Sequence, residues 1–249
     1  MSTLAPFAEG SPRFTARAGG FFWLMTILTG VFAMIAGRGF VVSGDAAATA
    51  VNILAGERMF RMGAVSNLIA TACYLAATVL VYAILKPVNR NISLLAAFFS
   101  LVGCAMGAVS SFLQLAPLSV LGGAQSLSGL TMQQSDALAF AFIRLGRLAS
   151  GVSFMFFGLH CLMVGSLILR STFMSRIVGA LMAFGGAGWL TFSLANLLAP
   201  AAAARNLSYL MLPGILGETA LTLWLLVMGV NVQRWKEQAI ASGQRGTGS

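Results

Sequence analysis

The chain has 249 residues, of which 58% are hydrophobic and only 8% are charged, and its mean hydropathy is +0.89. A soluble domain carries about 25% charged residues because its surface must face water, so this composition excludes a soluble globular protein. The net charge of +9 does not indicate a nucleic-acid partner, since the basic residues stand singly or in pairs between apolar runs. We therefore expect an all-α polytopic transmembrane helix bundle.

Six apolar runs are long enough to span a bilayer, which takes about 20 helical residues. The first run follows Arg17; a basic start before an apolar run also resembles a signal peptide, but this run is longer than a usual signal h-region, so we expect a retained span. The predicted spans are residues 18–37, 62–85, 92–116, 148–169, 177–199 and 207–232. They divide the chain into an N-terminal cytoplasmic segment (1–17), a six-helix transmembrane domain (18–233) and a cytoplasmic tail (234–249).

The first long connection, residues 38–61, holds five charges and is expected to lie outside the lipid. Asp45 is a favourable first residue for a helix, and the Ala-rich stretch after it predicts a short helix at the membrane interface. Residues 118–135 have no charge before Asp136 but are rich in Gly, Ser and Gln. We expect a loop there, or a re-entrant segment.

Prolines and length define the later helices. Pro117 is expected to stop or kink the third span, and Pro200 to end the fifth. The fourth helix is expected to start near Asp136 and to continue to Arg170, which makes it longer than a bilayer requires. Pro213 is expected to interrupt the sixth span.

The basic residues predict the orientation. Loops on the cytoplasmic side carry an excess of Lys and Arg. With both termini inside, nine basic residues fall on the inner side and four on the outer side. The inner set is Arg13, Arg17, Lys86, Arg90, Arg170, Arg176, Arg234, Lys236 and Arg245, and the outer set is Arg38, Arg58, Arg61 and Arg205. We therefore predict cytoplasmic termini, with anionic lipid headgroups as partners of the inner basic residues.

A shift of 83 residues superimposes two parts of the chain. It places residues 61–63 on 144–146, residues 115–117 on 198–200, and Gly103 on Gly186. Each part holds a span, a short basic turn and a second span, which suggests a parallel internal repeat of spans 2–3 and 4–5. Shared membrane composition would explain the same matches, so both interpretations stay open.

Four ionisable residues fall within or beside the spans, where charges are costly and usually have partners. Arg144 and Arg147 share one face of the fourth helix. Counted along straight helices, Arg147 lies about 34 Å above Arg170 and Glu218 about 24 Å above Arg234, so we predict a polar cluster of Arg144, Arg147 and Glu218. It would be either an anion site or an ion pair that locks two helices, and the ion pair is the favoured interpretation.

His160 is a weaker candidate. It lies about 15 Å above Arg170, and the estimated 9 Å between its height and that of Glu218 argues against a joint active site. A lone histidine is more often a hydrogen-bonded packing residue than a ligand. The three cysteines lack metal-ligand spacing, and no nucleophile, phosphate-loop or dinucleotide motif is present in the sequence. We predict no catalytic residue, no metal and no cofactor.

Several stretches resemble a bacterial membrane-protein family described as domain of unknown function 4386. They are ARAGGFFWL (16–24), GDAAATAVNILAGERMFRMG (44–63), YAILKPVNRNISLLAAFF (82–99), FFGLHCLMVGSLILRS (156–171) and the stretch from Gly217-Glu218 through ETALTLWLLVMGV. The resemblance implies a multi-pass protein of the bacterial inner membrane and brings no activity, ligand or site residue.

The sequence leaves two main hypotheses for the function. The first is a non-catalytic accessory or scaffold subunit that packs against other membrane proteins. The second is a small transporter, or a receptor that binds an anionic or lipid-like ligand through intramembrane Arg and Glu. A membrane enzyme is a third and weaker hypothesis, because only His160 and Glu218 could serve it.

Overall fold

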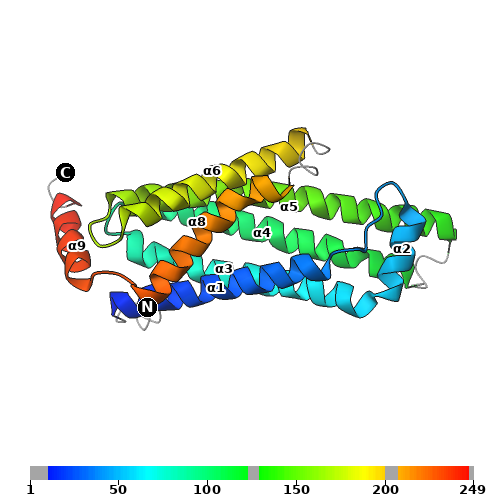
Figure 1. Cartoon of the computed structure of the whole chain (residues 1–249), viewed down its shortest axis with the longest axis horizontal. Coiled ribbons are helices and arrows are strands. Elements are labelled where there is room, and N and C mark those ends of the chain that lie inside the picture. The colour runs from blue at the N-terminus through cyan, green and yellow to red at the C-terminus, as the bar shows by residue number, and fades with distance from the viewer. Residues whose placement is uncertain (1–10, 123–128, 200–206, 247–249) are drawn as a thin grey trace.

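The computed structural model describes residues 11–122, 129–199 and 207–246, and all its named elements are helices. The long helices run side by side along the longest axis of the molecule (Figure 1). Short α2 lies across one end, while α9 lies at the other end, beside the start of α1. The helices are α1 (Pro12–Ala36), α2 (Ala46–Ala55), α3 (Glu57–Leu85), α4 (Arg90–Leu121), α5 (Met132–Arg170), α6 (Arg176–Leu198), α8 (Leu207–Val227) and α9 (Val232–Gly246).

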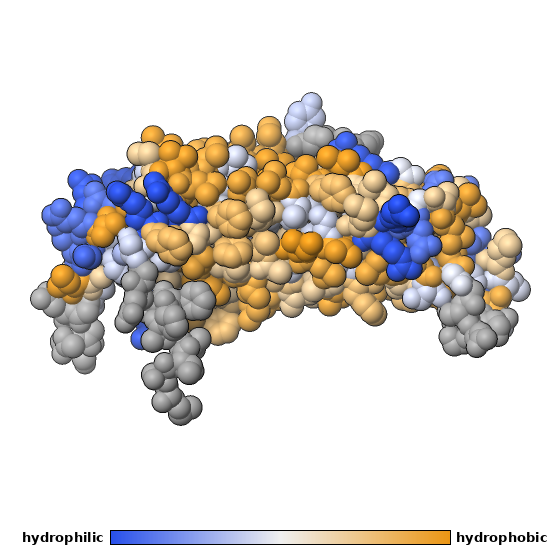
Figure 2. Space-filling view, turned by 90° about the horizontal axis from the view of Figure 1, so that it is seen from below, coloured by the Kyte–Doolittle hydropathy of each residue, from blue (hydrophilic) through white to orange (hydrophobic). Residues whose placement is uncertain are grey.

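Six of these helices, namely α1, α3, α4, α5, α6 and α8, are long and apolar enough to cross a membrane. The prediction of a six-span helical bundle is therefore confirmed. Figure 2 shows hydrophobic residues over the middle of the visible face and hydrophilic residues gathered toward both ends, as a protein whose middle is in lipid requires. The overlong α5 has 39 residues, from Met132 to Arg170, and would extend about 58 Å.

The prediction that Pro213 interrupts the sixth span is wrong, and Pro117, predicted to stop or kink the third span, does not stop it. α4 continues through Pro117 to Leu121, and α8 contains Pro213 without interruption. A proline inside a transmembrane helix is tolerated when neighbouring helices and local adjustments compensate for the lost backbone hydrogen bond. The expected loop at 118–135 is shorter, since its first and last residues are helical, and its residues 123–128 lie outside the described part. Pro200, expected to end the fifth span, also lies outside it.

The sixth span ends earlier than predicted. α8 stops at Val227, and Gly229 adopts a φ of +65°, which favours glycine. The backbone N–H groups of Met228 and Gly229 both donate to the carbonyl of Trp224, which closes the helix. The polar residues that follow form α9, where the sequence predicted only a tail.

The predicted short helix after Asp45 is present as α2. The Asp45 side chain accepts a 2.8 Å hydrogen bond from the backbone N–H of Ala48, which caps the helix. Thr49 and Ile53 are buried against the rest of the fold. The start of this helix therefore depends on one carboxylate.

Replacing Asp45 with Ala is expected to loosen α2 without affecting the spans. The lost cap costs about 1 kcal/mol, and the cost should fall mainly on this short helix. Hydrogen–deuterium exchange should speed up in residues 46–55 and stay unchanged in α5. Asp45→Asn, which keeps an oxygen acceptor, is the control, and equal exchange in Asp45→Ala and the wild type would contradict the prediction.

Glycines let α5 and α6 approach until their backbones touch. Gly158 faces Gly186, and Gly165 faces Gly179, in an antiparallel arrangement. A Cβ atom at Gly165 would lie 2.5 Å from the backbone nitrogen of Ala183, and one at Gly186 would lie 2.6 Å from that of Leu162. Small residues at helix crossings are the usual way in which membrane helices gain close packing.

Serine hydroxyls add hydrogen bonds between neighbouring helices. Ser66 donates from α3 to a carbonyl of α1, Ser153 from α5 to α4, and Ser193 from α6 to α5, at 2.7–2.9 Å. These bonds join helices in sequence order around the bundle. The internal repeat of spans 2–3 and 4–5 stays a prediction.

Candidate functional site

Glu218 lies near the middle of α8, with its carboxylate at a point where five spanning helices meet. Its Oε1 accepts a 3.0 Å hydrogen bond from the indole of Trp189 on α6, and its Oε2 accepts one of 3.3 Å from Trp23 on α1. The Tyr74 hydroxyl on α3 and the Cys161 thiol on α5 each donate to Oε1 at 3.5 Å. We call these five residues the Glu218 cluster.

The four donors of the cluster are buried, with exposed fractions of 0–5%, whereas Glu218 itself is partly buried. Three of the donors reach Oε1 and one, Trp23, reaches Oε2, so the carboxylate bonds to all four other helices of the cluster. Hydrogen bonds are a general way to compensate an ionised group inside a membrane. This carboxylate is held by neutral donors, where the sequence predicted arginines.

Close packing of α6 and α8 brings Trp189 to Glu218. A Cβ atom at Gly188 would lie 2.6 Å from Pro213, and one at Gly214 would overlap the Trp189 indole. Trp189 is also stacked on Phe154 of α5, with ring centroids 4.7 Å apart. The indole is therefore confined between helices, with its N–H directed at the carboxylate.

Replacing Gly214 with Ala is expected to push the Trp189 indole away from Glu218. The overlap should cost about 1–3 kcal/mol of stability, as overpacking of a tight site usually does. Thermal unfolding in detergent and the tryptophan fluorescence spectrum should both change. Leu216→Val, at an exposed neighbour on the same helix, is the control, and an unchanged unfolding temperature for Gly214→Ala would contradict the expected overlap.

His160 lies beside the Glu218 cluster. Its ring packs against Trp23 and Tyr74, with centroids 6.1 and 5.8 Å apart. Its Nδ1 is 2.8 Å from the carbonyl oxygen of Ala96, so this nitrogen carries the hydrogen and joins α5 to α4. Within the described residues its Nε2 is buried without a hydrogen-bond partner.

The predicted difference in height between His160 and Glu218 is wrong. Both residues contact Trp23 and Tyr74. The predicted height of Glu218 was counted from Arg234, whereas α8 stops at Val227. Counted from there, Glu218 lies about 14 Å above the helix end, nearly level with His160.

Because α8 ends early, Glu218 also lies far from Arg144 and Arg147. Arg147 precedes Cys161, which touches the carboxylate, by 14 residues, or about 21 Å along α5. Arg144 lies one turn farther away, and both arginines are exposed. In the described part of the chain, the ion pair present is Arg61 with Glu57 at 2.7 Å. The predicted cluster of Arg144, Arg147 and Glu218 is therefore corrected to Glu218 with aromatic and thiol donors.

Sequence reasoning missed Trp23 and Trp189, although a signal existed. A buried indole N–H needs an acceptor, and both tryptophans stand in the middle of apolar runs where few acceptors are available. A third, Trp224, has a buried Nε1 without a partner among the described residues. Among the described residues, no group of three or more His, Cys, Asp or Glu side chains is arranged to hold a metal ion.

Comparison with known proteins gives a family and no activity. The family model described as Domain of unknown function (DUF4386) matches residues 18–229, which include most of α1, the other five spans and the whole Glu218 cluster. No curated protein and no solved structure matches the chain. The chain belongs to the DUF4386 family.

Proposed function

We propose that the protein is a non-catalytic accessory or scaffold subunit of the bacterial inner membrane, which packs against other membrane proteins. The observation that carries this proposal is the Glu218 cluster. The carboxylate accepts hydrogen bonds from the chain's own Trp23, Tyr74, Cys161 and Trp189, and so joins five helices. These hydrogen bonds hold the five helices in one defined packing, which a scaffold needs.

The competing intramembrane anion site is not proposed. It required Arg144 and Arg147 beside Glu218, and Arg147 lies about 21 Å away along α5 from the residue that touches the carboxylate. A carboxylate that serves transport usually lines a cavity with a free face toward its substrate. The two oxygens of Glu218 instead have four donors within 3.5 Å.

We further propose that both termini are cytoplasmic. The start of α1 and the whole of α9 lie at the same end of the bundle (Figure 1). Arg13, Arg17, Lys86, Arg170 and Arg234 belong to helix ends and turns at this end, as the inner side of a membrane protein requires. A fluorescent protein fused to the C-terminus should fold and fluoresce, because that reporter requires the cytoplasm.

The scaffold role is tested by purification from native membranes in a mild detergent, with prior chemical cross-linking. A second membrane protein should be recovered in fixed proportion with the wild type. Recovery of a stable monomer alone, from cross-linked and untreated membranes alike, would overturn the proposal.

Two variants connect that test to the cluster. Glu218→Gln keeps an oxygen acceptor, so a structural carboxylate predicts that the partner is retained. Glu218→Leu keeps none, and should lose the partner together with stability. If Glu218→Gln folds with wild-type stability but fails to restore the phenotype of a strain that lacks the protein, the carboxylate has a chemical role. The scaffold proposal is then wrong.

A further inference from the structure

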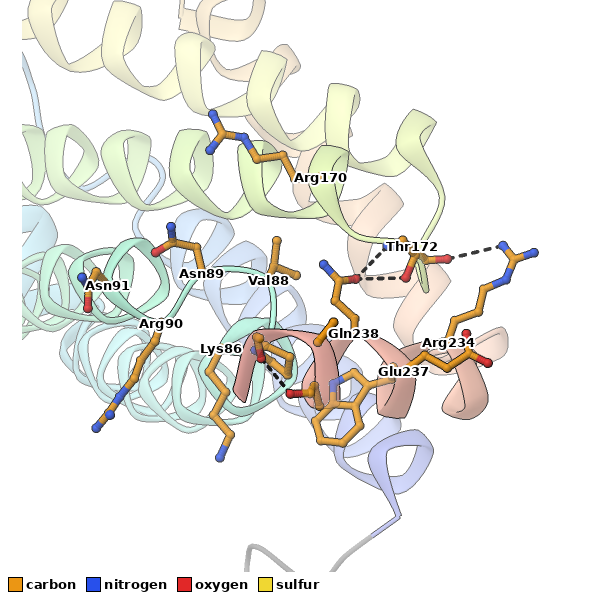
Figure 3. Close-up of a pocket in the computed structure, with 15 residues that line it drawn as sticks. Lys86, Val88, Asn89, Arg90, Asn91, Arg170, Thr172, Arg234, Glu237 and Gln238 are labelled. Carbon is orange, nitrogen blue, oxygen red and sulfur yellow. Dashed lines mark hydrogen bonds between the residues drawn. The ribbon is translucent and has the colours of Figure 1, made fainter. Parts of the chain in front are cut away.

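A groove lies at the end of the bundle that carries α9, with a volume of about 1400 Å³. One wall is the turn between α3 and α4, and the others are the end of α5 and one face of α9 (Figure 3). Lys86 and Arg90 point the same way from the turn, whereas Arg170, at the end of α5, extends to the opposite side (Figure 3). Arg234 is directed to the far wall, toward Thr172.

The α9 wall is fixed in place by specific contacts. The Trp235 indole donates a 2.9 Å hydrogen bond to the carbonyl of Ile84, and its ring packs against the main hydrophobic core. The side-chain oxygen of Gln238 accepts 3.0 Å bonds from both the backbone N–H and the hydroxyl of Thr172. Asn231 donates from its backbone to the carbonyl of Phe173. The groove is therefore a defined feature of the fold.

The charge of the groove is strongly unbalanced. Lys86, Arg90, Arg170 and Arg234 line it, against a single acidic residue, Glu237. All four cations are exposed, and none forms an ion pair with any residue that the structure describes. The excess of positive charge along the lining favours an anion at this end of the molecule.

We propose that this groove binds the phosphate of an anionic phospholipid headgroup, with Lys86 and Arg90 as its main basic contacts. The source is a lipid because the groove adjoins the lipid-facing surface. On α4, Leu94, Leu95 and Phe98 are exposed one to two turns after Arg90, and acyl chains would lie along them. Basic pockets at the cytoplasmic ends of membrane helices commonly hold such headgroups. The inference does not depend on the scaffold role.

The groove lining also provides uncharged contacts. Asn89 and Asn91 are exposed in the groove, and their side-chain amides can donate hydrogen bonds to phosphate oxygens or to a glycerol headgroup. Asn89 already caps α4, since its side chain accepts a bond from the backbone N–H of Ile92. The start of α4 is therefore ordered beside Lys86 and Arg90. A fixed arrangement of this kind distinguishes a binding site from a mobile basic loop.

The test is lipid retention measured by native mass spectrometry of the full chain. The protein is released from detergent after titration with phosphatidylglycerol or with zwitterionic phosphatidylcholine of the same acyl chains. Wild type should prefer phosphatidylglycerol. The double variant Lys86→Gln/Arg90→Gln should lose about 10- to 30-fold of its affinity for that lipid.

The control has the same loss of charge at the same end of the molecule. Arg176 and Lys236 are exposed and do not line the groove, so Arg176→Gln/Lys236→Gln should keep most of the preference. If both double variants lose affinity equally, the basic residues act only through their total charge, and the site is overturned.

A third arm distinguishes the lipid from a soluble anion. Glycerol phosphate, which carries the anionic group without acyl chains, should fail to displace phosphatidylglycerol at equal concentration. If it competes as well as the lipid does, the lipid assignment is wrong.

Trp235→Phe, which removes the bond to Ile84, should weaken lipid retention with the four cations still present. Unchanged retention would show that α9 forms no part of the site.

Discussion

Replacing Glu218 with Leu is expected to lower the free energy of unfolding by roughly 2–5 kcal/mol. The substitution removes the acceptor for Trp23, Tyr74, Cys161 and Trp189 at once. Each interhelical hydrogen bond in a membrane contributes about 0.6 kcal/mol on average, and a buried donor left without a partner costs about 1–3 kcal/mol. The losses occur in one network, so they will not add simply.

The measurement is unfolding in detergent, followed by tryptophan fluorescence because two of the four tryptophans contact the carboxylate. Glu218→Gln is the matched control, since its amide oxygen still accepts hydrogen bonds from the indoles. We expect it to lose much less stability than Glu218→Leu. If Glu218→Leu unfolds at the wild-type temperature, the cluster does not hold the bundle together.

Replacing Gly165 with Ala is the second change with a large expected effect. Alanine is intrinsically better than glycine in a helix by about 1 kcal/mol, so on propensity alone the variant would gain stability. Its Cβ, however, would lie 2.5 Å from the backbone nitrogen of Ala183 and 2.8 Å from the carbonyl oxygen of Gly179. Because backbone atoms cannot move aside as a flexible side chain can, we expect a net loss of about 1–3 kcal/mol.

Gly30 provides the control for this substitution. It also lies inside a transmembrane helix, but a Cβ atom there would meet nothing within 4 Å. Gly30→Ala should leave the unfolding temperature unchanged or raise it, while Gly165→Ala lowers it. A shift of the same sign in both variants would contradict the contact between α5 and α6.

The local features predicted from the sequence depend on residues close together in the chain. The six spans follow from runs of apolar residues, and the start of α2 follows from the carboxylate of Asp45. The length of α5 follows from the apolar run between Asp136 and Arg170, which contains no proline. Glu218 was identified as unusual because a charge within an apolar run is rare whatever the fold.

The partners of Glu218 could not be predicted in the same way. Its height in the bundle depended on where α8 ends, and apolar Val230 and Val232 concealed the break that Gly229 makes. Counting from Val227 instead of Arg234 moves Glu218 by seven residues, or about 10 Å along the helix, enough to exchange one set of neighbours for another. The glycine itself was a signal, because helices often end at this residue.

The sequence by itself determined that this is a six-span helical membrane protein with one carboxylate in its interior, since lipid permits few alternatives for such a composition. Only the tertiary structure decided that indoles, a phenol and a thiol hold the carboxylate, and that α9 completes a basic groove at one end of the bundle. Both features join residues from helices that are distant in the chain. Their contacts arise from close packing at glycines such as Gly165 and Gly188, which hydropathy alone does not describe.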